Sequence, residues 1–130
     1  MAESAKGRIV VADDDRDILE LVRFILTHAG YEVVGASDGV AALAAIEADH
    51  PNLAILDVMM PGLSGLEVLR RVRRNDAIKD LTVILLTVQA GDSDVAAGYA
   101  AGASDYVTKP VILSELLQLV KSSLERRARE

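Results

Sequence analysis

Short runs of aliphatic residues alternate along this chain with longer stretches whose apolar residues recur at helical spacing. The aliphatic runs cover residues 9–12, 31–35, 53–56 and 82–87, and 105–108 is a shorter one. Runs this short and this uniformly apolar are typical of parallel strands that are covered on both faces. The strand–helix unit occurs five times. The pattern therefore predicts an α/β fold with a doubly wound, five-stranded parallel sheet.

The stretches between the strands carry helix signals. Asp15 or Asp17 is expected to cap the first helix and Gly30 to end it, and Asp38 precedes the second helix. The fourth helix, near 92–101, is rich in alanine and weakly marked. The predicted inward-facing residues of the other four helices are Ile18, Leu21, Val22, Ile25, Leu26 and Ala29, then Ala42, Leu43 and Ile46, then Leu66, Leu69 and Val72, then Leu113, Leu116, Leu117, Val120 and Leu124.

The length of 130 residues corresponds to one domain, and a hydrophobic fraction of 51% excludes a mainly disordered chain. We expect a flexible tail at residues 1–7, the domain at 8–124 and a charged helical extension at 125–130. No apolar run approaches the ~18 residues of a membrane span, and residues 1–8 lack the apolar stretch of a signal peptide. The expectation is a cytoplasmic protein without a membrane partner.

Composition excludes several kinds of site. The chain has no cysteine, which rules out disulfides, zinc–thiolate sites and thiol nucleophiles. A net charge of −6 and an aromatic fraction of 3% argue against direct binding of nucleic acid. The basic run at 70–74 is expected to complement the end of the third helix, and His28 and His50 to lie on the surface near helix ends.

Polar residues follow the predicted strands at the edge where ligands bind in open parallel sheets. Asp13 and Asp14 follow the first strand, Asp57 the third, Thr87 ends the fourth and Lys109 follows the fifth. Taken singly, each fits an ordinary cap, turn or loop position. Together, clustered carboxylates at an exposed edge suit Mg²⁺. With a lysine beside them, they are suited to phosphoryl transfer onto a carboxylate that is already ionised at neutral pH.

Four segments carry a family resemblance. They are Ile-Val-Val-Ala-Asp-Asp-Asp at 9–15, Leu-Asp-Val-Met-Met-Pro-Gly at 56–62, Ile-Leu-Leu-Thr at 84–87 and Gly-Ala-Ser-Asp-Tyr-Val-Thr-Lys-Pro at 102–110. With these four segments in this order, the chain resembles the receiver domains of two-component response regulators over nearly its whole length. It is similar in kind to the chemotaxis regulators. The resemblance implies a flavodoxin-like (βα)5 fold with strand order 2-1-3-4-5.

The resemblance also implies residue roles. Asp57 would be the phosphoacceptor, and Asp13, Asp14, Asp57 and the main-chain carbonyl of Met59 would hold Mg²⁺, for which Mn²⁺ can substitute. It assigns the contacts with the phosphoryl group to Thr87 and Lys109. The residue expected to turn inward when the site is occupied is Tyr106, and Pro110 is expected to follow a cis peptide bond.

Two positions depart from the family pattern. Val88 stands where alanine or glycine is usual, next to Thr87, and is expected to narrow access to the site. Val111 replaces the usual phenylalanine after Lys109-Pro110 and is expected to loosen that corner. Neither residue takes part in the expected chemistry, so the two departures bear on the rate of phosphorylation rather than on the family to which the chain is assigned.

The implied function is a phosphorylation switch in bacterial-type signalling rather than an enzyme acting on a separate substrate. A sensor histidine kinase, a phosphotransfer protein or a small phosphodonor would supply the phosphoryl group, and the domain would slowly dephosphorylate itself. An effector or a phosphorylation-dependent second copy is expected on the face of the fourth helix, fifth strand and fifth helix. The fourth helix is almost uncharged and Leu119 is expected to be exposed, which favours apolar contact there.

Two other functions stay open. One is a phosphatase with an aspartyl nucleophile, for which 13–15 supplies an Asp-x-Asp spacing, although Asp57 and the segment 59–62 are then unexplained. The other is an interaction module that no longer uses phosphate, against which the intact acidic site argues. A nucleotide-binding site is not supported, because no glycine-rich loop follows the first strand.

Overall fold

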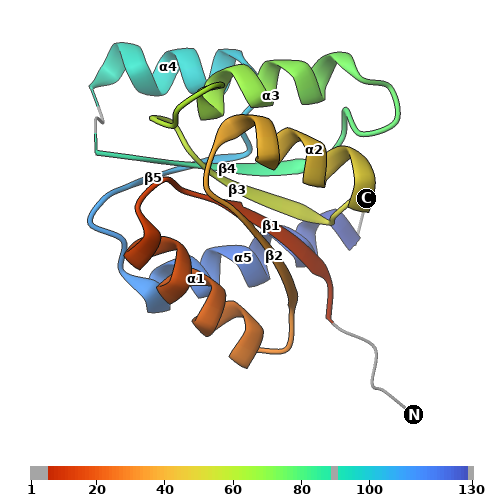
Figure 1. Cartoon of the computed structure of the whole chain (residues 1–130), viewed down its shortest axis with the longest axis vertical. Helices are drawn as coiled ribbons and strands as arrows, with labels where there is room; N and C mark the ends of the chain where they lie inside the picture. The colour runs from red at the N-terminus through yellow and green to blue at the C-terminus, as the bar shows by residue number, and fades with distance from the viewer. Residues whose placement is uncertain (1–5, 89–90, 129–130) are drawn as a thin grey trace.

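A computed structural model of the chain describes residues 6–88 and 91–128. Its centre is a five-stranded parallel sheet with the order β2-β1-β3-β4-β5, which confirms the predicted class and strand order (Figure 1). The strands are β1 (Arg8–Ala12), β2 (Glu32–Ala36), β3 (Leu53–Asp57), β4 (Thr82–Thr87) and β5 (Asp105–Thr108). Since all strands are parallel, their carboxyl ends share one edge.

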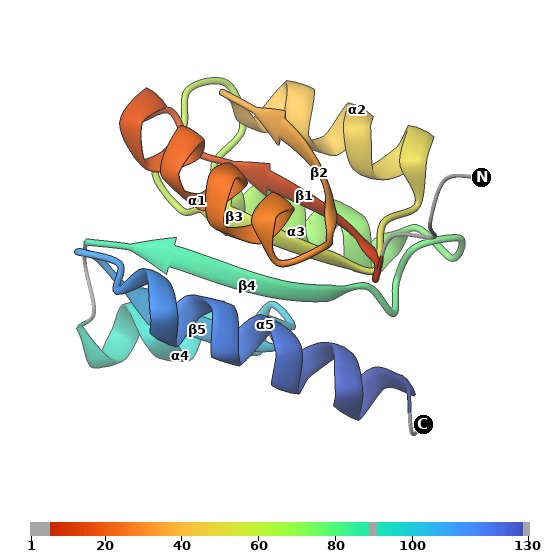
Figure 2. The same ribbon diagram turned by 90° about the horizontal axis from the view of Figure 1, so that it is seen from below.

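Helices cover both faces of this sheet. Helices α1 (Arg16–His28) and α5 (Leu113–Ala128) lie on one face, and α2 (Gly39–Asp49), α3 (Gly65–Arg74) and α4 (Asp92–Ala100) on the other (Figures 1 and 2). Alternate residues of β1 point to the two layers. Ile9 and Val11 belong to the core under α1 and α5, and Val10 and Ala12 to the core under α2 and α3. Burial on both faces explains why the strands are uniformly apolar.

The helix ends follow their capping residues. The Asp15 carboxylate accepts hydrogen bonds from the main chain of Asp17 and Ile18, so Asp15 and not Asp17 caps α1. Gly30 follows that helix with a φ of 105°, a conformation that favours glycine. Asp38 caps α2 as predicted. The N-cap of α4 is Gly91, which has no side chain to cap the helix, in agreement with the weak sequence signal there.

Three details differ from the sequence prediction. Leu119 is half-buried rather than exposed, because α5 lies along the edge strand and Leu119 lines a small cavity with Val107 and Ile112. Val68 is fully buried on α3, although the predicted inner face omitted it. Leu21, predicted to face inward on α1, is 54% exposed, and Leu19 is buried on that helix in its place.

The domain boundaries stay predictions. The one at residue 124 falls inside α5, which continues without a break to Ala128. Most of the predicted tail, residues 1–5, lies outside the described part of the chain. In the described ranges, no helix combines the length and the apolar character needed to cross a bilayer.

Candidate functional site

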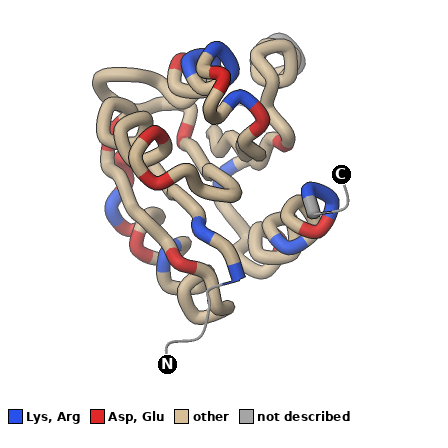
Figure 3. The backbone as a smooth tube through the Cα atoms, turned by 90° about the vertical axis from the view of Figure 1, so that its right-hand side faces the viewer, with Lys and Arg blue, Asp and Glu red and all other residues tan. Residues whose placement is uncertain are grey.

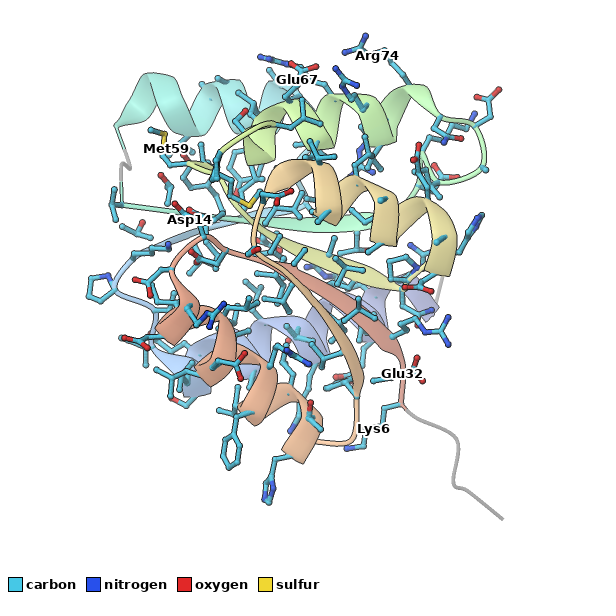
Figure 4. The ribbon with its side chains drawn as sticks, viewed as in Figure 1. Lys6, Asp14, Glu32, Met59, Glu67 and Arg74 are labelled. Atoms are coloured by element: carbon cyan, nitrogen blue, oxygen red, sulfur yellow. The ribbon has the colours of Figure 1, made fainter. Side chains whose placement is uncertain are left out.

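The predicted polar residues gather at the carboxyl edge of the sheet. Asp57 and Thr87 are the last residues of β3 and β4, Asp13 follows β1, and Lys109 follows β5. Three of these side chains are buried, with exposed fractions of 0% for Asp13, 4% for Asp57 and 1% for Thr87. Figure 4 shows Asp14 and Met59 at this same edge. The fold therefore brings together residues that are up to 96 positions apart in the sequence.

Lys109 joins two of the carboxylates. Its Nζ lies 2.9 Å from Oδ2 of Asp13 and 3.4 Å from Oδ1 of Asp57. The other oxygen of Asp13 accepts a hydrogen bond of 2.9 Å from the main chain of Asp15. Because the lysine side chain is only 10% exposed, water screens these charges weakly. One ammonium group thus serves two buried aspartates.

The electrostatics of this pair set the protonation of the site. Burial raises the pKa of Asp57 to about 7, the nearby Asp13 carboxylate raises it too, and Lys109 opposes both effects. Burial alone would lower the pKa of Lys109, but its contacts with Asp13 and Asp57 outweigh burial and raise it. The lysine therefore stays charged near neutral pH. Without a further cation, Asp57 is only partly ionised there, which corrects the sequence prediction of a carboxylate that is already ionised at neutral pH.

The carboxylates fit a hard divalent cation. Asp13, Asp14 and Asp57 each offer an oxygen, and these three oxygens lie within 4.8 Å of one another. Oδ2 of Asp13 is fully buried and accepts no well-aligned hydrogen bond, although Lys109 lies close to it. A buried oxygen in this position is costly unless a cation satisfies it. An all-oxygen donor set with exposed Asp14 at the rim suits Mg²⁺, which keeps part of its water shell.

A cavity of about 340 Å³ adjoins this site beneath α4. Its walls include Thr87 and Tyr106, together with Leu85 and the small residues Ala97 and Gly98. The ring of Tyr106 is half-buried and packs against the core on that side of the sheet. The carboxyl edge of the sheet and α4 are therefore linked through a cavity that Thr87 and Tyr106 both line.

The two positions that depart from the family pattern follow site residues in the chain, Val88 after Thr87 and Val111 after Lys109-Pro110. Val88 is 65% exposed and directly follows the buried Thr87. Val111 is half-buried and packs against the core under α1 and α5. The Lys109–Pro110 peptide bond is cis, the isomer expected from the resemblance.

The family model of the response regulator receiver domain matches residues 9–121, which include every one of these site residues. The chain belongs to the response-regulator receiver family. Response regulator MprA of Mycobacterium tuberculosis (strain ATCC 25618 / H37Rv) is 46% identical over 119 residues, covering 92% of this chain and 51% of that protein. The receiver thus spans about half the length of the curated relatives it matches.

Solved receiver domains share the whole architecture. A CheY-like receiver domain protein from Methanospirillum hungatei JF-1 superposes with a TM-score of 0.90 at 33% identity, over 97% of this chain and 98% of that one. The structure described as the BeF3-activated DrrB receiver domain has a TM-score of 0.83 at 38% identity, over 92% and 97%. This similarity shows that the chain has the flavodoxin-like receiver fold, with all five strands and all five helices.

Some features of the site were not predicted. The strand-end pattern located the acidic cluster, Thr87 and Lys109, but not how Lys109 divides its charge between Asp13 and Asp57. The role of Gly98 as a wall beside Tyr106 was also missed. Its signal was a glycine inside a predicted helix, which usually reflects a packing requirement. The main-chain carbonyl of Met59 stays a predicted ligand.

Proposed function

We propose that this receiver domain is a switch that accepts a phosphoryl group on Asp57 and changes its surface in response. The observation that carries the proposal is the position of Asp57. It is a buried carboxylate with Lys109 Nζ 3.4 Å from its Oδ1 and two further aspartates beside it. Clustered carboxylates beside a lysine suit phosphoryl transfer that is assisted by a divalent cation.

In the proposed reaction, an Oδ atom of Asp57 attacks the phosphorus of a phosphohistidine or of a small donor such as acetyl phosphate. The new bond is an acyl phosphate, and the bond from phosphorus to the donor breaks, with its electron pair leaving on the donor. The Lys109 ammonium, already held at the site, neutralises the transferring oxygens. Asp13, Asp14, Asp57 and the carbonyl of Met59 would hold Mg²⁺ or Mn²⁺, which supplies further positive charge there when bound.

The response would pass through Thr87 and Tyr106. Both line the cavity beneath α4, so a phosphoryl oxygen that draws the Thr87 hydroxyl would alter the space available to the Tyr106 ring. Reversing a two-state population from 1:99 to 99:1 takes about 5.5 kcal/mol of differential stabilisation. The BeF3-activated DrrB receiver domain, which superposes on this chain, supports activation of the fold by a bound ligand.

The partners we propose are a sensor histidine kinase or a phosphotransfer protein as donor, and an effector or a second copy on the face of α4, β5 and α5. Exposed Tyr99 and Ile112 are apolar contacts available on that face. We place this exchange in the cytoplasm and expect no turnover of a separate substrate beyond slow autodephosphorylation.

Intact mass after incubation with Mg²⁺ and acetyl phosphate tests the proposal. We expect one phosphoryl group on the wild-type chain, none on Asp57→Asn and none in EDTA. If no adduct forms with either acetyl phosphate or a sensor kinase, the domain is not a phosphorylation switch.

A further inference from the structure

A second cavity, of about 780 Å³, lies at the opposite end of the sheet from the aspartates. Its walls are the end of α3, the connection from α3 to β4, the start of β5 and the last turns of α5. Figures 1 and 2 show the C-terminal end of α5 at this end of the molecule, opposite the arrowheads of the strands. Nothing in the proposed phosphoryl transfer uses this cavity.

The lining of this cavity is strongly basic in an acidic protein. Arg73, Lys79, Arg126 and Arg127 line it together with one carboxylate, Asp80. Two of these cations have partners beside the cavity, since Arg126 pairs with Asp105 at 3.3 Å and Lys79 with Asp76 at 3.7 Å. The whole chain carries a net charge of −6, so the cavity is a local reversal of sign. Figure 3 faces this end and shows basic residues on the last turns of α5. Positive charge concentrated in a hollow attracts anions more strongly than the same charge on a flat surface.

Two of the guanidinium groups are fixed in place without being neutralised. Arg73 donates from Nε and Nη2 to the carbonyl of Gly102, at 3.1 and 2.7 Å, and from Nη1 to the carbonyl of Lys79 at 2.8 Å. Arg127 donates to the carbonyl of Asp80 at 3.0 Å. Carbonyl oxygens have no formal charge. Within the described ranges, neither arginine forms an ion pair with a carboxylate, although the charge of Asp80 acts on Arg73.

Hydroxyl groups complete the lining. Ser123 is only 3% exposed, and its Oγ accepts a hydrogen bond of 3.2 Å from Arg126. The Oγ of Ser104 accepts one of 3.1 Å from the main chain of Val83. A hydroxyl that accepts in this way still has its own proton to donate. The cavity therefore combines oriented guanidinium groups with hydroxyl donors, a combination suited to phosphate oxygens.

We propose that this cavity binds a small phosphorylated molecule carrying at least two negative charges, such as diphosphate or the diphosphate group of a nucleotide. The volume falls within the roughly 300–1,000 Å³ of small-molecule sites. Arginine matches tetrahedral phosphate through paired N–H groups, and two or more charges are needed to use several cations at once. The proposal is independent of phosphorylation at Asp57, which lies at the other edge.

Calorimetric titration of the whole chain in EDTA, with inorganic diphosphate and with ADP, tests this site. The absence of divalent metal keeps the anion away from the acidic edge. We expect saturable one-to-one binding that Arg127→Gln weakens by about tenfold, because a hydrogen bond to a charged group is lost. Arg71→Gln is the matched control. It also removes one positive charge, but Arg71 lies on α3, pairs with Glu67 and does not line the cavity.

The two probes separate the sources of the phosphate. Tighter binding of ADP assigns a role to the nucleoside, and equal binding assigns the affinity to the phosphates alone. Amide NMR shifts should centre on Gly102, Ser104 and Ser123. Three results would overturn the proposal: no saturable binding of either probe, equal weakening by both variants, or shifts centred on Asp13 and Asp57. Unchanged melting of Arg127→Gln, whose side chain is exposed, would exclude misfolding as the cause.

Discussion

The ring of Tyr106 packs directly against Gly98 of α4. A Cβ atom built on Gly98 would lie 2.9 Å from Cε2 of Tyr106 and 3.3 Å from Cδ1 of Leu85. The first distance is closer than side chains normally approach, so any larger residue at 98 would force the ring or the helix to move. The position of the Tyr106 ring is therefore coupled to the position of α4, because Gly98 has no side chain to keep the two apart.

The effect of Gly98→Ala on the free energy of unfolding should depend on which residue stands at position 106. Alanine improves helix propensity by about 1 kcal/mol, and overpacking against the Tyr106 ring costs about 1–3 kcal/mol. We expect no gain, or a loss of up to about 2 kcal/mol, in the wild-type background, but a gain of about 1 kcal/mol in Tyr106→Ala. Urea unfolding of the four proteins measures this.

The control for this cycle is Ala96→Gly, at an exposed position on the same helix. It should cost about 1 kcal/mol in both backgrounds, because only helix propensity changes. Equal effects of Gly98→Ala in the two backgrounds would show that the ring does not depend on this glycine.

Asp57 should make the metal-free domain less stable as pH rises. Its folded pKa of about 7 lies above its ordinary value of 3.8, so the folded state binds more protons between these values. The free energy of unfolding therefore falls with rising pH in this window, by up to about 1.4 kcal/mol per unit. We expect the stability gain from Asp57→Asn in EDTA to grow by about 2–3 kcal/mol between pH 5 and pH 7. A gain that is constant with pH would contradict the raised pKa.

Removal of the shared ammonium should be costly. Lys109→Met leaves Asp13 and Asp57 buried without their cation, and breaking a buried pair costs about 3–5 kcal/mol. The loss should be larger at pH 8 than at pH 5, where Asp57 can take up a proton instead. Lys79→Met is a suitable control. Lys79 is 52% exposed and 3.7 Å from Asp76, so its removal should cost less than about 1 kcal/mol.

Mg²⁺ binding should release a proton below neutral pH. A metal ligand must be deprotonated, and Asp57 is largely protonated below its pKa of about 7. The apparent affinity should fall by up to about tenfold per unit as pH drops from 7 to 5. Calorimetry in two buffers of different ionisation enthalpy counts the proton. Any Mg²⁺ affinity that Asp57→Asn retains should vary much less over that range.

Val88 offers a test of access to the site. Its side chain is 65% exposed beside Thr87, so shortening it disturbs no core contact. If the valine hinders the approach of small donors, Val88→Ala should speed phosphorylation by acetyl phosphate by less than about tenfold, or 1.4 kcal/mol of barrier. Unchanged urea stability would assign the effect to access. An unchanged rate of phosphorylation would show that Val88 does not hinder access to the site.

The sequence was most informative where one physical rule decides the outcome. Strands buried on both faces must be apolar throughout, so β1, β3 and β4 were found almost to the residue. Because parallel strands end at one edge, the convergence of Asp13, Asp57 and Lys109 followed from topology alone.

The sequence did not reveal features of the structure that depend on packing between elements distant in the chain. Leu119 is covered by its approach to β5, and Arg73 is held by Gly102, a carbonyl 29 positions away. The raised pKa of Asp57 depends on burial and on the distances to Asp13 and Lys109. None of these is encoded in the spacing of residues along one helix or strand.

The presence of one lysine beside a cluster of three aspartates has a consequence for the net charge of the site. When all three carboxylates are ionised, the cluster with Lys109 has two negative charges in excess, which one divalent cation balances. Conversion of the Asp57 carboxylate into a dianionic acyl phosphate would then leave one charge unmatched in a poorly hydrated place. That surplus charge would attract nearby hydroxyl groups and would favour transfer of the phosphoryl group to water, which restores the Asp57 carboxylate. The site that holds its divalent cation but no phosphoryl group would be electrically neutral, and this charge balance would favour the return to it after phosphorylation.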